Sequence, residues 1–235
     1  MKRNDTVWRS ENLARQFLTG VRGAIPLADT QIAVMLQLLD TGRPVRRCLD
    51  LGCGDGVLGA SILTQYPKAT GVFVDFSEPM LAACQKRISS PAEFLLTDYA
   101  KPSWVKQVTG WAPFDAIVSG FSIHHQPDRR KQALYREIHD LLASGGWFIN
   151  IEHVEPACPT TTQLFEAAMV SSIHRAQPHL SRSVVRRRFV DRPDKSANIL
   201  APVETQCRWL RRLGFVEVDC YFKHFELAVF GGRRQ

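Results

Sequence analysis

The amino-acid sequence predicts an α/β protein built on a doubly wound, mostly parallel sheet of seven strands. Between residues 45 and 151, short apolar runs alternate with helix-compatible segments, which is typical of parallel strands with helices on both faces. Near the end of the chain, strand-like runs at 215–221 and 225–230 are joined too tightly for a crossover helix, which predicts an antiparallel hairpin. With 235 residues, of which 45% are hydrophobic, the chain can bury the core of one large, Rossmann-like domain.

Each element has a local signal. Apolar spacing predicts mostly helix over residues 10–39, with breaks at its glycines and proline. The expected strands are 46–51, 71–75, 93–96, 114–119 and 147–151, and the expected helices are 56–66, 77–88, 128–142 and 203–213. Ser77 is expected to cap the second of these helices, and Ser144-Gly145-Gly146 to end the third. A less regular segment, residues 156–202, interrupts the alternation.

The composition narrows the class of protein. A net charge of +7 is compatible with a nucleic-acid partner or an acidic substrate, but the arginines are mostly dispersed, which favours an ordinary solvated surface. No apolar run reaches the ~18 residues of a membrane span, so no membrane segment is expected. The six cysteines form no C-x-x-C pair or cysteine–histidine cluster. This predicts free thiols in a reducing cytoplasm and no metal site.

The stretch V-R-R-C-L-D-L-G-C-G-D-G-V-L-G at 45–59 predicts a ligand-binding turn. An apolar run ends in Asp50, and Gly52, Gly54 and Gly56 follow at alternate positions before a helix-compatible run. Such a turn lets a ligand lie directly on the backbone and against a helix N-terminus. A carboxylate before the glycines would repel a pyrophosphate, and it suits a ligand with a positive end, such as an amino group or a sulfonium.

Further polar side chains follow the next strands, at the edge where ligands bind in a doubly wound sheet. Asp75 can accept hydrogen bonds from both hydroxyls of a ribose. Asp98 and Tyr99 can meet an adenine through an amino-group hydrogen bond and stacking. Phe76 and Met80 can supply apolar walls. An adenosine with a cationic amino-acid tail would fit all of these groups.

Five motifs in order resemble those of the class I S-adenosylmethionine-dependent methyltransferases. They read L-D-L-G-C-G-D-G, V-D-F-S-E-P-M-L, L-L-T-D-Y, F-D-A-I-V-S-G-F-S-I-H-H and L-L-A-S-G-G-W, and W-L-R-R-L-G-F-V-E-V-D-C-Y-F-K is similar to the final helix and hairpin of that family. The resemblance implies S-adenosylmethionine as the donor and S-adenosylhomocysteine as the product. The glycines also match the dinucleotide pattern G-x-G-x-x-G, but Asp50, Asp98 and the hairpin favour the methyl donor.

The resemblance also implies roles for single residues. The backbone of Gly52-Cys53-Gly54 would approach the methionine part of the donor, while Asp50 would orient the turn and meet the amino group. Asp75 would hold the ribose, and Ser119 and Gly120 would line the sulfonium side.

We expect one methyltransferase domain over residues 1–235. Within it, residues 1–44 would form a helical N-terminal lid and residues 45–155 the cofactor-binding core. Residues 156–202 would be a cap insertion, and residues 203–235 the final helix and hairpin.

Methyl transfer from a sulfonium is an in-line displacement that needs a base only when the nucleophile must lose a proton early. His124 and His125 follow the fourth strand and are the candidate bases, with His124 slightly preferred; the alternative is that they only cap the loop. Glu152 and His153 follow the fifth strand, where Glu152 is a catalytic candidate and His153 a substrate-binding candidate. The alternative is a satisfied pair that holds the insertion in place.

The cap carries arginines that suit an anionic acceptor. Arg182 and Arg186 could bind a carboxylate or a phosphate, although a solvated helix face explains them as well. Trp8, Phe17 and Arg22 belong to the expected N-terminal lid.

The best-supported function is methyl transfer to an oxygen, nitrogen or carbon atom of a small molecule by a monomer or homodimer. The alternative is an RNA-modification enzyme that uses S-adenosylmethionine or a derivative of it, because residues 181–211 loosely resemble carboxy-S-adenosylmethionine synthases. Ser119-Gly120-Phe121-Ser122 stands where an N-P-P-Y-type tetrapeptide would favour methylation of an exocyclic base amine. A scaffold on the same fold is the third hypothesis, and the intact motifs argue against it.

Overall fold

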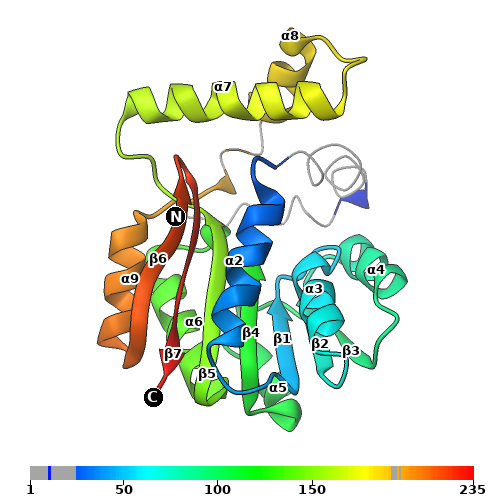
Figure 1. Ribbon diagram of the computed structural model, residues 1–235, viewed down its shortest axis with the longest axis vertical. Coiled ribbons are helices and arrows are strands. Elements are labelled where there is room, and N and C mark those ends of the chain that lie inside the picture. The colour runs from blue at the N-terminus through cyan, green and yellow to red at the C-terminus, as the bar shows by residue number, and fades with distance from the viewer. Residues whose placement is uncertain (1–9, 12–24, 192–194, 196) are drawn as a thin grey trace.

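The computed structural model describes residues 10–11, 25–191, 195 and 197–235. In this part of the chain the structure is a three-layer sandwich, with a central sheet between two layers of helices (Figure 1). The strands are β1 (Arg47–Leu51), β2 (Thr70–Asp75), β3 (Ala92–Leu96), β4 (Phe114–Gly120), β5 (Leu142–His153), β6 (Phe215–His224) and β7 (Leu227–Arg234). Half of the predicted lid, including Trp8, Phe17 and Arg22, lies outside the described residues.

The strand order is β3-β2-β1-β4-β5-β7-β6, with β7 antiparallel to both of its neighbours. This confirms the predicted fold class, a mostly parallel seven-stranded sheet with a C-terminal antiparallel hairpin. The order of the strands reverses between β1 and β4, and in such sheets the ligand-binding crevice opens at that point, beyond the carboxyl ends of the strands.

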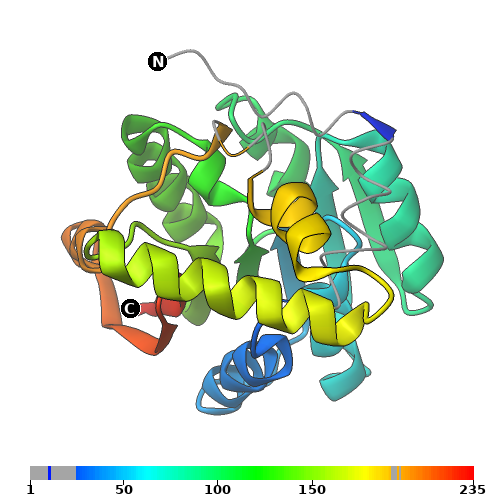
Figure 2. The same cartoon turned by 90° about the horizontal axis from the view of Figure 1, so that it is seen from above.

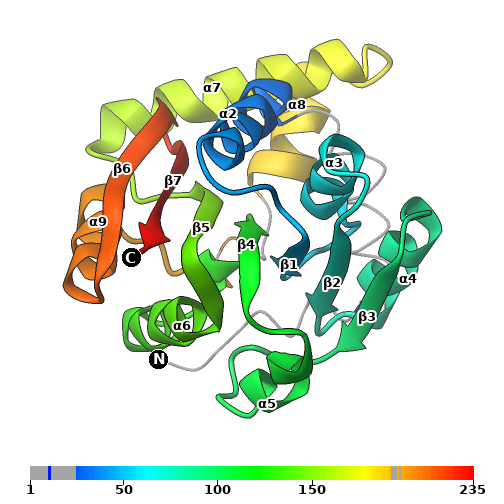
Figure 3. The same cartoon turned by 60° about the horizontal axis from the view of Figure 1, so that its bottom comes forward.

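Apolar side chains at helical spacing build a core on each face of the sheet. Helices α2 (Ala28–Asp40), α3 (Val57–Gln65) and α4 (Glu78–Arg87) cover one face through residues such as Met35, Ile62 and Leu81. Helices α5 (Trp104–Val108), α6 (Asp128–Leu141) and α9 (Val203–Arg212) cover the other through Trp104, Leu134 and Leu210. Figure 3 shows α2 and α3 on the side of the sheet opposite α5 and α6.

The structure differs from the sequence prediction around the fifth strand. β5 begins at Leu142, directly after α6, and runs through the glycines that were expected to end the helix. Gly145 has a φ of 76°, a left-handed conformation that glycine adopts without strain. The pairing with β4 shifts register between Phe114 and Ala116, so the glycines form an irregular start to the strand.

A long helix, α7 (Pro159–Ala176), stands where the sequence predicted irregular structure. Together with α8 (Arg182–Val185) it lies across the end of the molecule to which β1 and β4 point (Figures 1 and 2). Val170, Ile173, Val185 and Val190 form a small apolar cluster within this segment. The position over the strand ends suits the predicted cap, and the division of the chain into lid, core and cap stays a prediction. In the described residues, no helix is long and apolar enough to cross a membrane.

Gly231 in β7 is expected to be essential for the packing of β7 against β5. A Cβ atom at this position would lie 2.0 Å from the Phe148 carbonyl oxygen, a backbone atom that cannot move away cheaply. We expect Gly231→Ala to lower the free energy of unfolding by about 2 kcal/mol or more, measured by urea denaturation. Gly110→Ala is the matched control, because a Cβ there meets nothing within 4 Å. Equal stability of the two variants would contradict the packing.

Candidate active site

The glycine turn after β1 adopts the conformation that its sequence predicts. Gly52, Gly54 and Gly56 have φ values of 66°, 55° and 76°, which side-chain-bearing residues rarely adopt. Gly52 is also crowded, because a Cβ atom there would lie 2.0 Å from Ser122 Oγ and 3.2 Å from Tyr99 Cε1. The backbone of the turn therefore packs directly on the segments that follow β3 and β4.

Asp50 braces the helix that follows this turn. Its side chain is 1% exposed, and its Oδ2 accepts a hydrogen bond from the Gly59 N–H of α3 at 2.9 Å. This contact gives a geometric basis to the predicted orienting role. The predicted contact with the amino group of the donor stays a prediction, because Asp50 is not among the residues that line the cleft beside the turn.

Asp75 joins the end of β2 to the glycine turn. Its Oδ2 accepts the Gly54 N–H at 2.9 Å, and its Oδ1 accepts the Ser77 N–H at 2.8 Å. Burial raises the pKa of Asp75 to about 6, although the backbone hydrogen bonds oppose that shift. The carboxylate is therefore ionised at neutral pH. Each of its oxygens keeps a lone pair for a ribose hydroxyl.

A cleft of about 70 Å³ lies between the glycine turn and the ends of β2 and β4. We call it the donor cleft. It is lined by Gly52, Cys53, Gly54, Asp75, Phe76, Ser77, Met80, Gly120, Phe121, Ser122 and His125. The structure thus brings together most of the residues that the sequence predicted for the donor. Three further lining residues were not predicted, although they lie inside the same sequence motifs: Ser77, Phe121 and Ser122.

A second cleft, of about 590 Å³, continues from the first along β3. Phe76 lines both clefts, and the second also contains Leu96, Thr97 and Asp98. Leu96 is 56% exposed and lines this cleft, so it offers an apolar surface to a planar ring. Asp98 thus lines the cleft that adjoins the donor cleft, and its contact with an adenine stays a prediction.

Two predicted lining residues are buried instead. Ser119 is 0% exposed and donates from its hydroxyl to the Leu51 carbonyl at 2.7 Å, because β4 continues to Gly120 and leaves Ser119 within the sheet. Tyr99 is 4% exposed, and its hydroxyl shares a 2.7 Å hydrogen bond with Ser122 Oγ. The Tyr99 ring lies beneath Gly52, so it supports the glycine turn from below.

A buried acid–histidine cluster follows β4 and β5. His124 Nδ1 lies 2.6 Å from Glu152 Oε1, and the His124 backbone N–H donates to Glu152 Oε2 at 3.0 Å. The His153 N–H also donates to Glu152 Oε1, at 2.8 Å. Burial raises the pKa of Glu152 to about 7, although the backbone N–H groups of His153 and His124 oppose that shift.

His125, and not the slightly preferred His124, lines the donor cleft. The two rings lie 4.0 Å apart between centroids, with His124 held against Glu152. His125 Nδ1 lies 3.3 Å from the Ala197 carbonyl oxygen. A carbonyl only accepts, so this contact assigns the proton to Nδ1 and leaves Nε2 as the basic nitrogen. The 3₁₀ turn at Ile123–His125 determines which of the two histidines lines the cleft.

Glu226, at the turn between β6 and β7, was not among the predicted site residues. Its Oε2 lies 2.6 Å from His153 Nε2, and its side chain is buried. The His153 ring lies 5.4 Å from the Phe165 ring of α7, so this pair joins the end of β5 to the cap. The only signal in the sequence is an acid within an otherwise apolar stretch, F-E-L-A-V-F.

The two predicted substrate-binding arginines contact the cap itself. Arg182 donates to Ser171 Oγ of α7 at 2.8 Å. Arg186 forms an ion pair with Glu166 of α7 at 2.7 Å, and Lys195 forms a second ion pair with Glu166 at 2.9 Å. Because both arginines already bind polar groups of α7, these contacts favour the alternative that the two side chains belong to a solvated helix face and do not bind substrate.

A mostly parallel sheet of this order, with a glycine turn and an acid after the neighbouring strand, defines a Rossmann-like fold. Residues 48–146 match a family model described as a methyltransferase domain. The match identifies residues 48–146, less than half of the chain, as a methyltransferase domain.

Similar sequences agree with this assignment over about half of the chain. An uncharacterized methyltransferase of Mycobacterium tuberculosis is 35% identical over 123 residues, which is 51% of this chain and 58% of that protein. A ribosomal RNA small subunit methyltransferase C of Pasteurella multocida is 33% identical over 56% of this chain and 37% of that protein. A malonyl-[acyl-carrier protein] O-methyltransferase of Magnetococcus marinus is 34% identical over 37% of this chain and 32% of its own length. The chain thus spans less than two thirds of these relatives.

Solved structures share the fold over nearly the whole chain. Human N-acetylserotonin methyltransferase in complex with S-adenosylmethionine superposes with a TM-score of 0.64 and 16% identity, covering 97% of this chain and 57% of that one. An O-methyltransferase family protein from Burkholderia thailandensis superposes with a TM-score of 0.60 and 16% identity, covering 99% of this chain and 67% of that one.

Glu152 is expected to make stability depend on pH. Its pKa rises from 4.5 to about 7 on burial, so between these values the folded state holds a proton that the unfolded state has lost. The stability contributed by this group is therefore present below its unfolded pKa and is lost as the pH rises through 7. We expect Glu152→Gln, which cannot ionise, to lose less stability than the wild type between pH 5 and pH 8, by on the order of 1–2 kcal/mol.

Urea denaturation across this pH range measures the effect. His124, His125 and His153 surround the carboxyl in both proteins, so the difference between the two curves isolates Glu152. The exposed neighbour Glu155 supplies the control, Glu155→Gln. Parallel curves for the wild type and Glu152→Gln would show that Glu152 stays ionised in the folded protein.

Proposed function

We propose that this protein transfers a methyl group from S-adenosylmethionine to an oxygen, nitrogen or carbon nucleophile of a small molecule. One observation carries the proposal. The donor cleft and the cleft along β3 share Phe76, and Asp75 and His125 both line the donor cleft. An adenosine with a sulfonium tail matches the polar and apolar groups of this arrangement.

The residues fit the donor part by part. Asp98 and Phe76 would hold the adenine, and Asp75 the ribose hydroxyls. The glycine turn would receive the methionine part on its backbone. The ionised Asp75 is a negative group beside the cleft, which favours a donor with a positive sulfur.

The donor supplies an activated methyl group, so the protein has to position the acceptor and exclude water. His125 Nε2 would take the proton of an acceptor hydroxyl or amine, while Nδ1 stays on the Ala197 carbonyl. Glu152 and His124 would stabilise the charge on the neighbouring imidazole, with ring centroids 4.0 Å apart. Glu152 thus acts through the histidines as a positioning residue.

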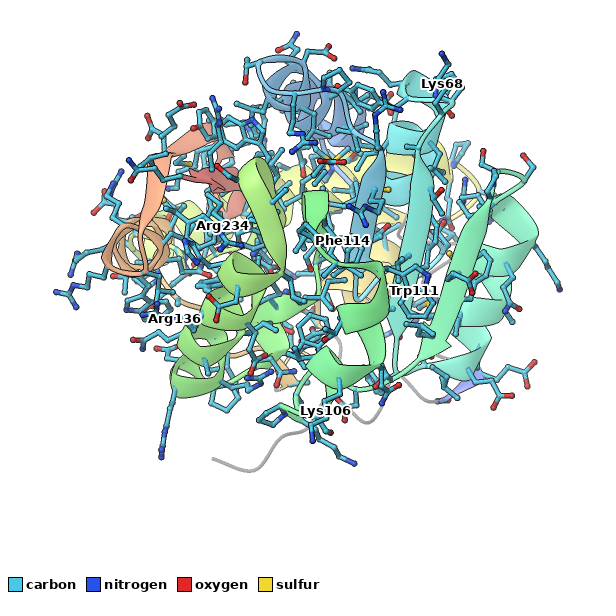
Figure 4. The ribbon with its side chains drawn as sticks, turned by 90° about the horizontal axis from the view of Figure 1, so that it is seen from below. Lys68, Lys106, Trp111, Phe114, Arg136 and Arg234 are labelled. Atoms are coloured by element: carbon cyan, nitrogen blue, oxygen red, sulfur yellow. The ribbon has the colours of Figure 1, made fainter. Side chains whose placement is uncertain are left out.

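The structure offers less support for an RNA substrate. Lys68, Lys106, Arg136 and Arg234 come from different elements and lie apart around the face opposite the cap (Figure 4). A derivative of the donor with an added carboxylate would need a cation beside the methyl. The described lining residues of the donor cleft include neither lysine nor arginine.

Calorimetry tests the donor. We expect S-adenosylhomocysteine to bind with micromolar affinity and NAD not to bind. Asp75→Ala should weaken S-adenosylhomocysteine at least 100-fold, because it removes the ribose acceptor and frees the Gly54 N–H. Asp140→Ala on the exposed surface of α6 is the control and should bind as the wild type does. Binding of NAD, or unchanged binding by Asp75→Ala, would overturn the assignment of the donor.

A panel of phenols, amines, carboxylic acids and RNAs with radiolabelled S-adenosylmethionine tests the acceptor class. With the acceptor that this panel identifies, His125→Asn should reduce kcat by about 100-fold or more and leave the affinity for S-adenosylhomocysteine within about threefold. His139→Asn, on α6 and away from the clefts, should retain full activity. Methylation of RNA alone, with a steep salt dependence of binding, would refute the small-molecule assignment.

A further inference from the structure

A third cleft, of about 610 Å³, lies between the N-terminal turns of α2 and α3. We call it the α2–α3 cleft. Its size falls within the range of small-molecule sites, roughly 300–1,000 Å³. The apolar part of its wall is formed by Ile25, Leu27, Ile32, Leu58, Phe121 and Ile151. Leu27 is 48% exposed there, so a large apolar side chain faces solvent at the mouth of a concave surface.

This cleft adjoins the donor cleft through Phe121, which lines both. The Phe121 N–H donates to the Ile151 carbonyl at 2.8 Å, which fixes the residue at the ends of β4 and β5. Its φ is 51°, a conformation that is costly for a bulky residue and that tends to persist at functional sites. Leu58 packs on the preceding Gly120, where it would lie 2.8 Å from an added Cβ. A molecule in the α2–α3 cleft would therefore reach the methyl position past one aromatic side chain.

The polar groups of the wall indicate the kind of ligand. Gln31 is 1% exposed and donates from Nε2 to the Pro26 carbonyl at 2.9 Å. Its Oε1 is buried and has no hydrogen-bond partner in the described part of the structure. An unpaired buried acceptor costs free energy that a donor on a ligand would recover.

The charges of the wall point the same way. Asp29 lies in the first turn of α2, and Arg87, the only cation among the described residues of the wall, is bound to Asp55. Arg87 donates to the Asp55 carboxylate at 2.6 Å and to the Asp55 carbonyl at 2.9 Å. The wall therefore offers oxygen acceptors and a cation that is already paired, so it suits a neutral or cationic ligand better than an anion.

We propose that the α2–α3 cleft binds the methyl acceptor, and that the acceptor is a neutral or cationic molecule with an apolar or aromatic body and a hydroxyl or amine that donates to Gln31. This deepens the proposed function and rests on it. It replaces the anionic acceptor that the cap arginines suggested, since Arg182 and Arg186 are bound to α7. Phe121 is then the residue that separates the acceptor body from the donor.

Three naphthalene probes that differ in charge test the ligand class. 1-Naphthol is neutral, 1-naphthylmethylamine is a cation and 1-naphthoate is an anion at neutral pH. Binding to the wild-type protein saturated with S-adenosylhomocysteine is measured by fluorescence. We expect the naphthol and the amine to bind at least tenfold more tightly than the naphthoate. Tighter binding of the naphthoate would overturn the proposed class.

Two variants test the location. Ala28→Trp and Thr30→Trp place an indole at the wall of the cleft, on the first turn of α2. We expect each to weaken the naphthol and the amine at least tenfold while the affinity for S-adenosylhomocysteine stays unchanged. Thr64→Trp, at the exposed end of α3, is the matched control and should bind the probes as the wild type does. Thermal unfolding shows which variants fold, and Thr30 is exposed, so its replacement leaves the core intact.

Gln31→Leu tests the polar contact. Loss of its Oε1 should weaken 1-naphthol about fivefold and leave 1-methylnaphthalene, which has no donor, unchanged. Probe binding that both tryptophan variants retain would place the ligand outside the cleft and refute the proposal. Failure of the proposed function is a separate result, because it would show as absence of S-adenosylhomocysteine binding to the wild-type protein.

Discussion

The carboxylate of Asp75 holds together the two loops on which the rest of the site depends. It accepts the N–H of Gly54 from the turn after β1 and the N–H of Ser77 before α4. The Gly52 and Cys53 N–H groups also bond to β2, through the Val74 carbonyl. A buried carboxylate is costly unless it is hydrogen-bonded, so the turn and the acid stabilise each other. The backbone that would receive the donor is thus fixed before any ligand arrives.

The opposite wall of the site depends on contacts between segments far apart in the sequence. The chain that returns from the cap lies on the histidine turn, where Ile199 N–H donates to the His124 carbonyl at 2.9 Å. Lys131 of α6 is 1% exposed, and it binds Asp128 at 2.8 Å and the Ile199 carbonyl. A buried ammonium needs such partners. The segment that returns from the predicted cap thus contacts the turn that carries His125, through Ala197 and Ile199.

The sequence predicted the sheet well because local signals decide it. Apolar runs of strand length and the glycine turn depend on neighbours within a few residues, so β1 to β4 lie within one residue of their predicted bounds. The helix α7 was missed because Phe165, Val170 and Ile173 are its buried positions in 18 residues, too sparse a pattern to indicate a helix.

The candidate site was predictable where short sequence motifs carry its residues. The described lining residues of the donor cleft all come from three such motifs. The choice between His124 and His125 depends on a single turn, and a one-residue extension of β4 buries Ser119. Glu226 contacts His153, which lies 73 residues earlier in the chain. Gln31 lies in no motif, and its buried Oε1 has no hydrogen-bond partner in the described part of the chain. Spatial neighbours of this kind cannot be read from spacing.

The two halves of the sheet divide the work of the proposed reaction. The clefts along β1, β2 and β3 present acids and glycine backbone, which suits a donor with a cationic end. The ends of β4 and β5 present Phe121 and Ile151 to the α2–α3 cleft and His125 to the donor cleft. An acceptor that approaches past Phe121 would therefore meet the methyl group and the base at the same edge of the sheet. Because Gly120 and Ile151 are paired in register, β4 and β5 fix the relative positions of Phe121, Ile151 and the turn that carries His125.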